Sequence, residues 1–108
     1  GKSLLNKVFG PKIILSSSSI VVQIQPPGQA VVFASDFVSK VLGGFGTKTY
    51  SVSKDGINWT SSTNLYSLSV TYTCSDLGNN IMRIRVVDGA GQDIVTVNVN
   101  VQDNQGFC

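Results

Sequence analysis

The side chains best suited to covalent chemistry in this chain are two cysteines, Cys74 and Cys108. Two cysteines are too few for a zinc site, which takes four ligands, and the chain has no histidine or glutamate to complete one. In an extracellular domain the two thiols can form one bridge. The sequence leaves three outcomes open: a bridge within the chain, a link to a neighbouring chain, or a buried free thiol.

Acid–base catalysis is the second chemistry to consider, and the composition argues against it. Histidine, the commonest general base, is absent, and all six acidic residues are aspartates. Asp36, Asp76, Asp88 and Asp103 fall at expected strand ends, where aspartate favours turns by bonding its own backbone. The alternative for these four is a calcium site. We therefore predict that the chain is not an enzyme and has no cofactor, with calcium as the one alternative.

Length and charge limit the classes of partner that we expect for the chain. Its 108 residues fit one domain, and only 13% of them are charged. The net charge of +2 is spread singly, without a basic stripe, so we expect no nucleic-acid partner. No apolar run approaches about 20 residues, so we expect no membrane insertion. The chain begins with Gly1 rather than methionine, which favours a processed, secreted product.

The elements that position these residues are predicted to be strands, because apolar and polar residues alternate with a period of two. Glycine-bearing turns separate the strands. Together they predict an immunoglobulin-like antiparallel β-sandwich of seven to eight strands with an N-terminal extension. The predicted inward rows in the last third are Tyr66, Leu68, Val70, Tyr72 and Cys74; Met82, Ile84 and Val86; and Val95, Val97, Val99 and Val101.

The single tryptophan, Trp59, follows the Asp55-Gly56 turn signal and shares a predicted strand face with Ile57. We expect it to be a core aromatic, as in many sandwiches. The alternative is a surface aromatic that stacks on a sugar.

Two apolar segments do not fit a simple sandwich. Residues 1–19 are predicted to be either an N-terminal arm or a first strand followed by a serine-rich hinge, and residues 20–108 the sandwich itself. Residues 38–47 read as an unusually apolar loop, which either folds over the core or forms a sticky surface patch. As a candidate subunit interface the arm supplies Leu4, Leu5, Val8, Phe9, Ile13 and Leu15, and the loop supplies Val41, Leu42 and Phe45.

Several turns of the chain resemble those of a known module. Thr73-Cys74-Ser75-Asp76-Leu77-Gly78, Val87-Asp88-Gly89-Ala90-Gly91 and Val101-Gln102-Asp103-Asn104 resemble motifs of immunoglobulin-like repeats in large secreted proteins of Bacteroidota, related to the hyalin-repeat and PKD groups. The resemblance covers about residues 20–104. It implies a non-enzymatic role in adhesion or in fibrous structure at the cell surface.

One departure from that family bears on function. The family often has a cysteine in the loop before the third strand, and here the apolar residues 41–46 replace it. We therefore predict an extracellular structural module that assembles with copies of itself into a surface fibre or filament, through its arm and apolar loop. The alternatives are an adhesin repeat that binds a glycan or protein ligand, and a passive spacer in a larger surface protein.

Overall fold

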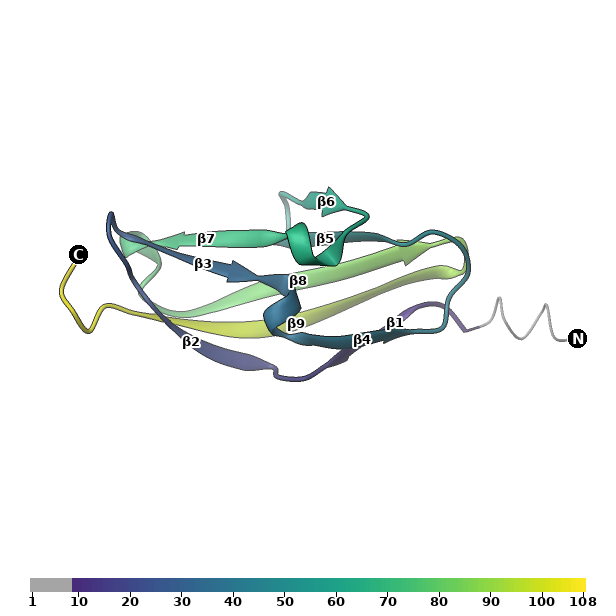
Figure 1. Ribbon diagram of the computed structural model, residues 1–108, viewed down its shortest axis with the longest axis horizontal. Coiled ribbons are helices and arrows are strands. Elements are labelled where there is room, and N and C mark those ends of the chain that lie inside the picture. The colour runs from purple at the N-terminus through teal and green to yellow at the C-terminus, as the bar shows by residue number, and fades with distance from the viewer. Residues whose placement is uncertain (1–8) are drawn as a thin grey trace, which may run out of the picture.

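The computed structural model describes residues 9–108, which form an all-β sandwich of two stacked layers (Figure 1). The described residues contain nine strands, where seven or eight were expected. The strands are β1 (Lys12–Leu15), β2 (Ser19–Gln23), β3 (Gln29–Phe33), β4 (Val38–Leu42), β5 (Thr49–Ser53), β6 (Thr60–Ser62), β7 (Ser69–Thr73), β8 (Gly78–Asp88) and β9 (Gly91–Gln102). No helix among these residues has the length and apolar character needed to cross a membrane.

The larger layer is a five-stranded sheet with the order β2-β9-β8-β5-β6. The long hairpin of β8 and β9 forms its centre, and β2 adds to β9 in parallel. The remaining pairs in this sheet are antiparallel. We call the face of this sheet that is turned away from the second layer its outer face.

The second layer consists of two ribbons, β1-β4 and β3-β7. Strands β3 and β4 are separated by one 3₁₀ turn, η1 (Ala34–Asp36), so they are two parts of an interrupted strand. The turn explains why apolar residues fall on both faces of this segment, because Ala34 and Phe37 both enter the core. It also corrects the loop predicted from residue 38: the apolar residues up to 42 form β4 because they pair with β1.

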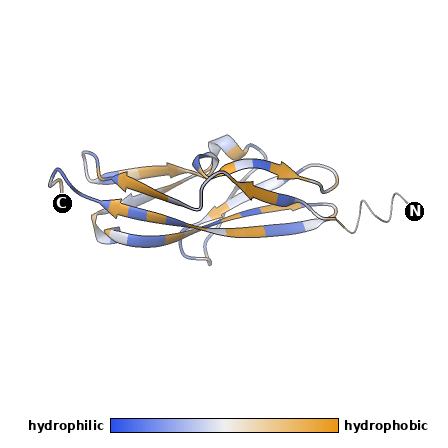
Figure 2. Cartoon of the chain, turned by 90° about the horizontal axis from the view of Figure 1, so that it is seen from below, coloured by the Kyte–Doolittle hydropathy of each residue, from blue (hydrophilic) through white to orange (hydrophobic). Residues whose placement is uncertain are grey.

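The core lies between the layers, and the strands alternate between hydrophobic and hydrophilic residues along their length (Figure 2). The register predicted for the last two strands is confirmed, since Met82, Ile84 and Val86 pack inward with Val97, Val99 and Val101. The other buried hydrophobic residues are Ile13, Ile24, Ala30, Val32, Ala34, Phe37, Val52, Leu68, Val70 and Tyr72.

The inward row predicted for β7 is wrong at its first residue. Tyr66 belongs to the 3₁₀ turn η2 (Leu65–Ser67) and is 74% exposed. The Asn64 side chain accepts a hydrogen bond from the Tyr66 amide at 3.0 Å and starts the turn. The period of two therefore begins only at Leu68, one residue before β7.

Trp59 is not a core residue, contrary to the prediction. Strand β6 pairs Ser61 with Ser51, whose side chain lies on the outer face opposite Arg85. Trp59 is two residues before Ser61, so it points to the same outer face. There it lies half-buried with the Arg85 guanidinium 4.2 Å from its ring centroid.

The predicted N-terminal segment divides between the sandwich and the undescribed part. Strand β1 pairs antiparallel with β4, and Ile13 is only 4% exposed in the chain's own core. Residues 16–18 then carry the chain across to β2 in the other layer. The predicted interface residues Leu4, Leu5 and Val8 lie outside the described residues.

Candidate functional site

The sandwich is elongated, 59 × 20 × 20 Å, and its two ends differ (Figure 1). The described chain starts at the end that holds the β8–β9 turn, which we call the open end. It finishes at the opposite end, where the only two cysteines meet, which we call the disulfide end. The predicted interface residues that remain exposed gather at the open end, which is therefore the candidate site.

Three segments build the open end: residues 9–12, the loop of residues 43–48, and the β8–β9 turn. The Gly44 amide donates to the Phe9 carbonyl at 3.3 Å, and the Gly89 amide donates to the Phe45 carbonyl at 2.9 Å. These bonds tie the loop to both of its neighbours. The loop therefore lies across the end of the sandwich instead of extending into solvent.

Asp88 is the polar centre of this arrangement. Its carboxylate accepts hydrogen bonds from the Phe45 amide at 3.1 Å and the Ala90 amide at 2.8 Å. Lys48 lies 3.2 Å from the same carboxylate, whose side chain is fully buried. One side chain thus fixes the loop and the turn together.

The Asp88 carboxylate keeps its charge in this setting. Burial raises its pKa, but hydrogen bonds from the Ala90 amide, Lys48 and the Phe45 amide outweigh burial and leave the pKa below its ordinary value. A charged carboxylate accepts stronger hydrogen bonds than a neutral one. The fastening of the loop is therefore present at neutral pH.

Two glycines allow the loop to approach so closely. Gly43 and Gly44 have φ values of +69° and +82°, a region that L side chains rarely adopt. A Cβ at Gly44 would also collide with the Asp88 carboxylate. The glycines that interrupt the apolar run therefore serve to bring the loop onto Asp88.

The fastened loop leaves apolar side chains in solvent. Phe9 is 65% exposed, Phe45 62% and Leu42 47%, and we call these three residues the apolar end patch. Phe9 and Leu42 border an open surface pocket of about 520 Å³. The pocket is also lined by Gly10, Pro11, Lys12, Gly43, Gln92 and Asp93. Sequence reasoning does not reach Gln92 and Asp93, because only the fold shows that β9 starts beside residues 9–12.

Three other predicted interface residues belong to the chain's own packing. Ile13 lies in the core, and Leu15 and Val41 pack against it. They pair across β1 and β4, where Ile13 faces Val41. We predicted Ile13 and Leu15 as anchors on a neighbouring subunit and Val41 as a receiver of such an anchor, but their side chains have partners within the chain.

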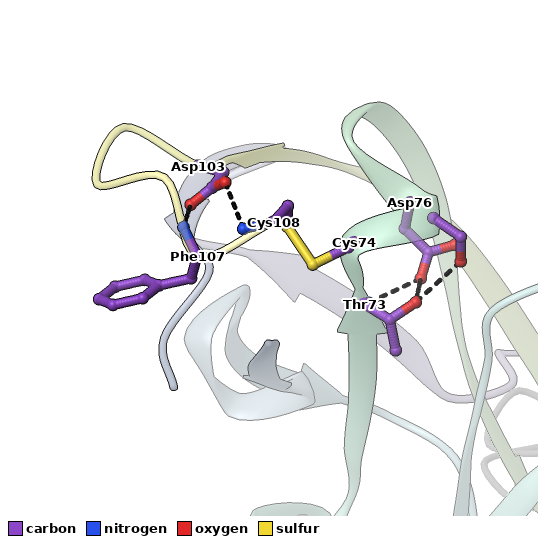
Figure 3. Close-up of a disulfide and its surroundings, with 7 residues drawn as sticks. Thr73, Cys74, Asp76, Asp103, Phe107 and Cys108 are labelled. Carbon is purple, nitrogen blue, oxygen red and sulfur yellow. Dashed lines mark hydrogen bonds between the residues drawn. A yellow bond between two sulfur atoms is a disulfide. The ribbon is translucent and has the colours of Figure 1, made fainter. Parts of the chain in front are cut away.

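The disulfide end is closed covalently (Figure 3). Cys74 and Cys108 form a bridge within the chain, with their Cα atoms 5.6 Å apart. Asp103 accepts hydrogen bonds from the amides of Phe107 and Cys108, both at 2.8 Å. These bonds fold the last residues back towards Cys74. Of the three outcomes that the sequence leaves open, the structure has the intrachain bridge.

A second aspartate orders the strand end at the disulfide end. Asp76 accepts a hydrogen bond from the Thr73 amide at 2.8 Å (Figure 3). Its carboxylate also pairs with Lys54 at 2.7 Å. Burial raises the Asp76 pKa, but the bonds from Lys54 and Thr73 outweigh it and lower the pKa overall.

The four aspartates considered for calcium serve separate turns. Asp36 accepts a hydrogen bond from the Phe33 amide at 3.1 Å, and Asp76, Asp88 and Asp103 accept from amides of their own turns or of a neighbouring loop. Within residues 9–108, no three His, Cys, Asp or Glu side chains lie close enough together to hold a metal ion. Backbone hydrogen bonding accounts for the placement of all four.

Comparisons with known proteins bear on the fold of the chain and not on its function. No protein-family model and no curated protein matches the chain. Among solved structures, the chain is similar to part of a putative alpha-galactosidase from Bacteroides fragilis, with a TM-score of 0.50 and 13% sequence identity. The match covers 88% of this chain and 18% of that one. The chain thus spans less than a fifth of the protein it matches, and the likeness concerns the sandwich only.

Proposed function

We propose that the chain is an extracellular structural module that packs end to end with copies of itself through the apolar end patch. The observation that carries this proposal is the exposure of Phe9, Leu42 and Phe45 together on one end of a rod-shaped domain. Large exposed apolar side chains that cluster are typical of protein contact sites. The disulfide supports an oxidising, extracellular setting, since such bridges are rare in reducing compartments.

The contact we propose is head to tail. The two ends of the rod differ in their residues (Figure 1), and we propose that the apolar end patch of one copy meets the disulfide end of the next. Leu77 and Phe107 are exposed near the disulfide end and are the apolar partners we propose for the patch. A contact between two different surfaces of one chain does not close on itself, so it generates filaments. The resemblance to cell-surface repeats fits the same role.

The test is the concentration dependence of mass, measured by light scattering and sedimentation. The variant Leu42→Ser with Phe45→Ser removes most of the apolar end patch and leaves the Asp88 contacts to the loop backbone in place. The matched control is Val21→Ser, because Val21 is equally exposed but lies on the body of the sandwich in β2. We expect mass to grow with concentration in the wild type and the control, and to stay at the monomer in the double variant.

Two results would contradict the proposal. A wild-type chain that stays monomeric at millimolar concentration, with no fibres in electron micrographs, favours a passive spacer. Equal growth of mass in the wild type and in the double variant places the contact elsewhere on the sandwich.

A further inference from the structure

A second surface of the chain lies on the outer face of the five-stranded sheet. It combines an aromatic ring with arginines, whereas the apolar end patch has only apolar side chains. Trp59 covers Arg85 there, with the guanidinium carbon 4.2 Å from the indole centroid. The indole stacks on the guanidinium, and the Nε atom of Arg85 is buried.

The residues before Trp59 hold it in place. Asp55 accepts hydrogen bonds from the amides of Ile57 and Asn58, at 2.8 and 2.7 Å, and from the Asn58 side chain. Ser53 adds bonds to Asp55 and to the Gly56 amide. The Asn58 and Ile57 amides keep the pKa of Asp55 well below its usual range, so this turn stays charged and intact at neutral pH.

The residues after Trp59 are fixed as well. Strand β6 pairs with β5, and the hydroxyl groups of Ser61 and Ser51 are 2.7 Å apart. Ser51 is almost fully buried, although it belongs to the outer face. The loop and β6 therefore form a built cover over this face, and Trp59 is an ordered part of it.

Arg83 and Arg85 alternate with buried residues along β8, and their side chains have hydrogen-bond donors that the described chain leaves without acceptors. Among residues 9–108 neither Arg83 nor Arg85 forms an ion pair. Arg85 makes one long hydrogen bond, 3.5 Å to Ser51, and its buried Nε has no acceptor within the described chain. Arg83 lies against the backbone of Gly56. Asp55, the carboxylate of the turn that contains Gly56, already accepts the hydrogen bonds described above.

We propose that Trp59, Arg85 and Arg83 bind an acidic carbohydrate. A uronic acid ring packs against the edge of the indole, on the side where its carboxylate reaches the arginine head groups. The sugar carboxylate accepts hydrogen bonds from the arginine head groups, which are planar donors suited to carboxylates. A rigid aromatic ring supplies contact area without loss of side-chain freedom, since it is already ordered. This site is separate from the end-to-end contact and does not depend on it.

A sugar fits these residues better than a nucleic acid does. Single-stranded nucleic acids need several aromatic residues in a row and a positively charged groove along the backbone. This surface has one aromatic ring and two arginines, and the chain carries a net charge of only +2. An open surface that holds one or two sugar rings binds weakly, with a dissociation constant of about 0.1–1 mM.

The chain offers a site-specific signal, because Trp59 is its only tryptophan. The probes are trigalacturonic acid, the neutral trisaccharide galactotriose, and an oligothymidylate, each titrated into the full chain while tryptophan fluorescence is followed. We expect a saturable change with trigalacturonic acid and affinity for galactotriose at least about tenfold weaker, since one charge-assisted bond is worth roughly that factor. Oligothymidylate should cause no saturable change.

Variants then assign the binding to these residues. Trp59→Ala, followed by calorimetry, should abolish binding of trigalacturonic acid, and Arg85→Gln should remove the preference for it over galactotriose. The control is Tyr66→Ala, which deletes another exposed aromatic ring. Trp59→Phe keeps a ring and, with a thermal melt of every variant, separates loss of the site from loss of the fold.

The proposal is overturned by any of four results. These are no saturable signal with trigalacturonic acid up to 10 times the expected dissociation constant of about 1 mM, equal affinity for the neutral trisaccharide, binding that survives Trp59→Ala in a folded protein, or tighter binding of oligothymidylate. The last result would make the surface a base-stacking site.

Discussion

The two ends of the sandwich are both held by a hydrogen-bonded aspartate that pairs with a lysine, but they differ in what else holds them. At each end one aspartate accepts a hydrogen bond from at least one backbone amide and pairs with one lysine. The pairs are Asp88 with Lys48 at the open end, and Asp76 with Lys54 at the disulfide end. Only the disulfide end adds a covalent bridge, from Cys74 to the last residue. The open end has no bridge, and glycines there bring the loop backbone onto Asp88.

This difference shows what each end is built to keep in place. The bridge ties the final residues of the chain to η3 (Cys74–Asp76), where few apolar contacts hold them. At the open end, hydrogen bonds hold the loop backbone while Phe45 stays in solvent. A backbone that is fixed beneath exposed side chains costs little further entropy when a partner binds. The open end therefore presents its apolar side chains on a hydrogen-bonded backbone, and the disulfide end presents Leu77 and Phe107 beside a covalent bridge.

The largest effect should come from removing the bridge. The variant Cys74→Ala with Cys108→Ala opens a loop with a sequence separation of 34, and chain entropy predicts a loss of about 4 kcal/mol in the free energy of unfolding. Guanidinium denaturation of the oxidised wild type and the double variant measures it. If the two ends are independent, the free energy of the local opening that exposes the Phe45 amide proton to exchange should be the same in both proteins. A loss of less than about 1 kcal/mol would show that the unfolded chain gains little freedom from the cut.

A smaller effect concerns Tyr72, which lies in the core towards the disulfide end. Its hydroxyl group is buried without a hydrogen-bond partner among the described residues, and burial, with a contribution from Asp76, raises its pKa to about 12. The unfolded chain loses this proton near pH 10, before the folded chain does. Stability should therefore be full below pH 10 and fall between pH 10 and pH 12, by on the order of 1 kcal/mol after solvent screening is allowed for.

The control for this prediction is Tyr72→Phe, which lacks the proton. Between pH 10 and pH 12 its unfolding free energy should decline less than that of the wild type. At pH 7 the variant should be as stable as the wild type or up to about 1 kcal/mol more stable, because it buries no unpaired hydroxyl group. A clear loss of stability at pH 7 would mean that the hydroxyl group has a partner, such as a buried water molecule.

The sequence predicts the sandwich well where one strand face is dry and the other wet. The rows of β8 and β9 follow from their alternation, because a shift by one residue would turn every inward side chain to solvent. Trp59 and Tyr66 were misplaced for a related reason. Trp59 precedes a three-residue strand and Tyr66 lies in a 3₁₀ turn, so neither belongs to a run of alternation long enough to fix its face.

The candidate site could be predicted only in part. The apolar run with glycines marks Leu42 and Phe45 as unusual, and both are exposed. Ile13 and Val41 are equally apolar, yet they pair across β1 and β4 and enter the core. Composition alone does not separate these cases, since the difference lies in the register of two strands that are more than twenty residues apart. The fastening by Asp88 depends in the same way on contacts distant in sequence.

The smallest effect separates the two fastenings. Asp88→Asn keeps the shape of the side chain but removes its charge, so the amide of Phe45 loses a strong acceptor. We expect its proton to exchange about tenfold faster at pH 7. The matched variant Asp76→Asn at the disulfide end should change the free energy of unfolding by less than about 1 kcal/mol, because the Asp76–Lys54 pair is partly exposed.

The pKa values of Asp76 and Asp88 are lowered in the folded chain. The stability that the two carboxylates contribute is therefore present above pH 4 and is lost as the pH falls through their folded pKa values. Below that range the variants and the wild type should therefore converge. If Asp88→Asn left Phe45 exchange unchanged while self-association persisted, the apolar end patch would owe its position to the glycines and β4 rather than to the buried charge.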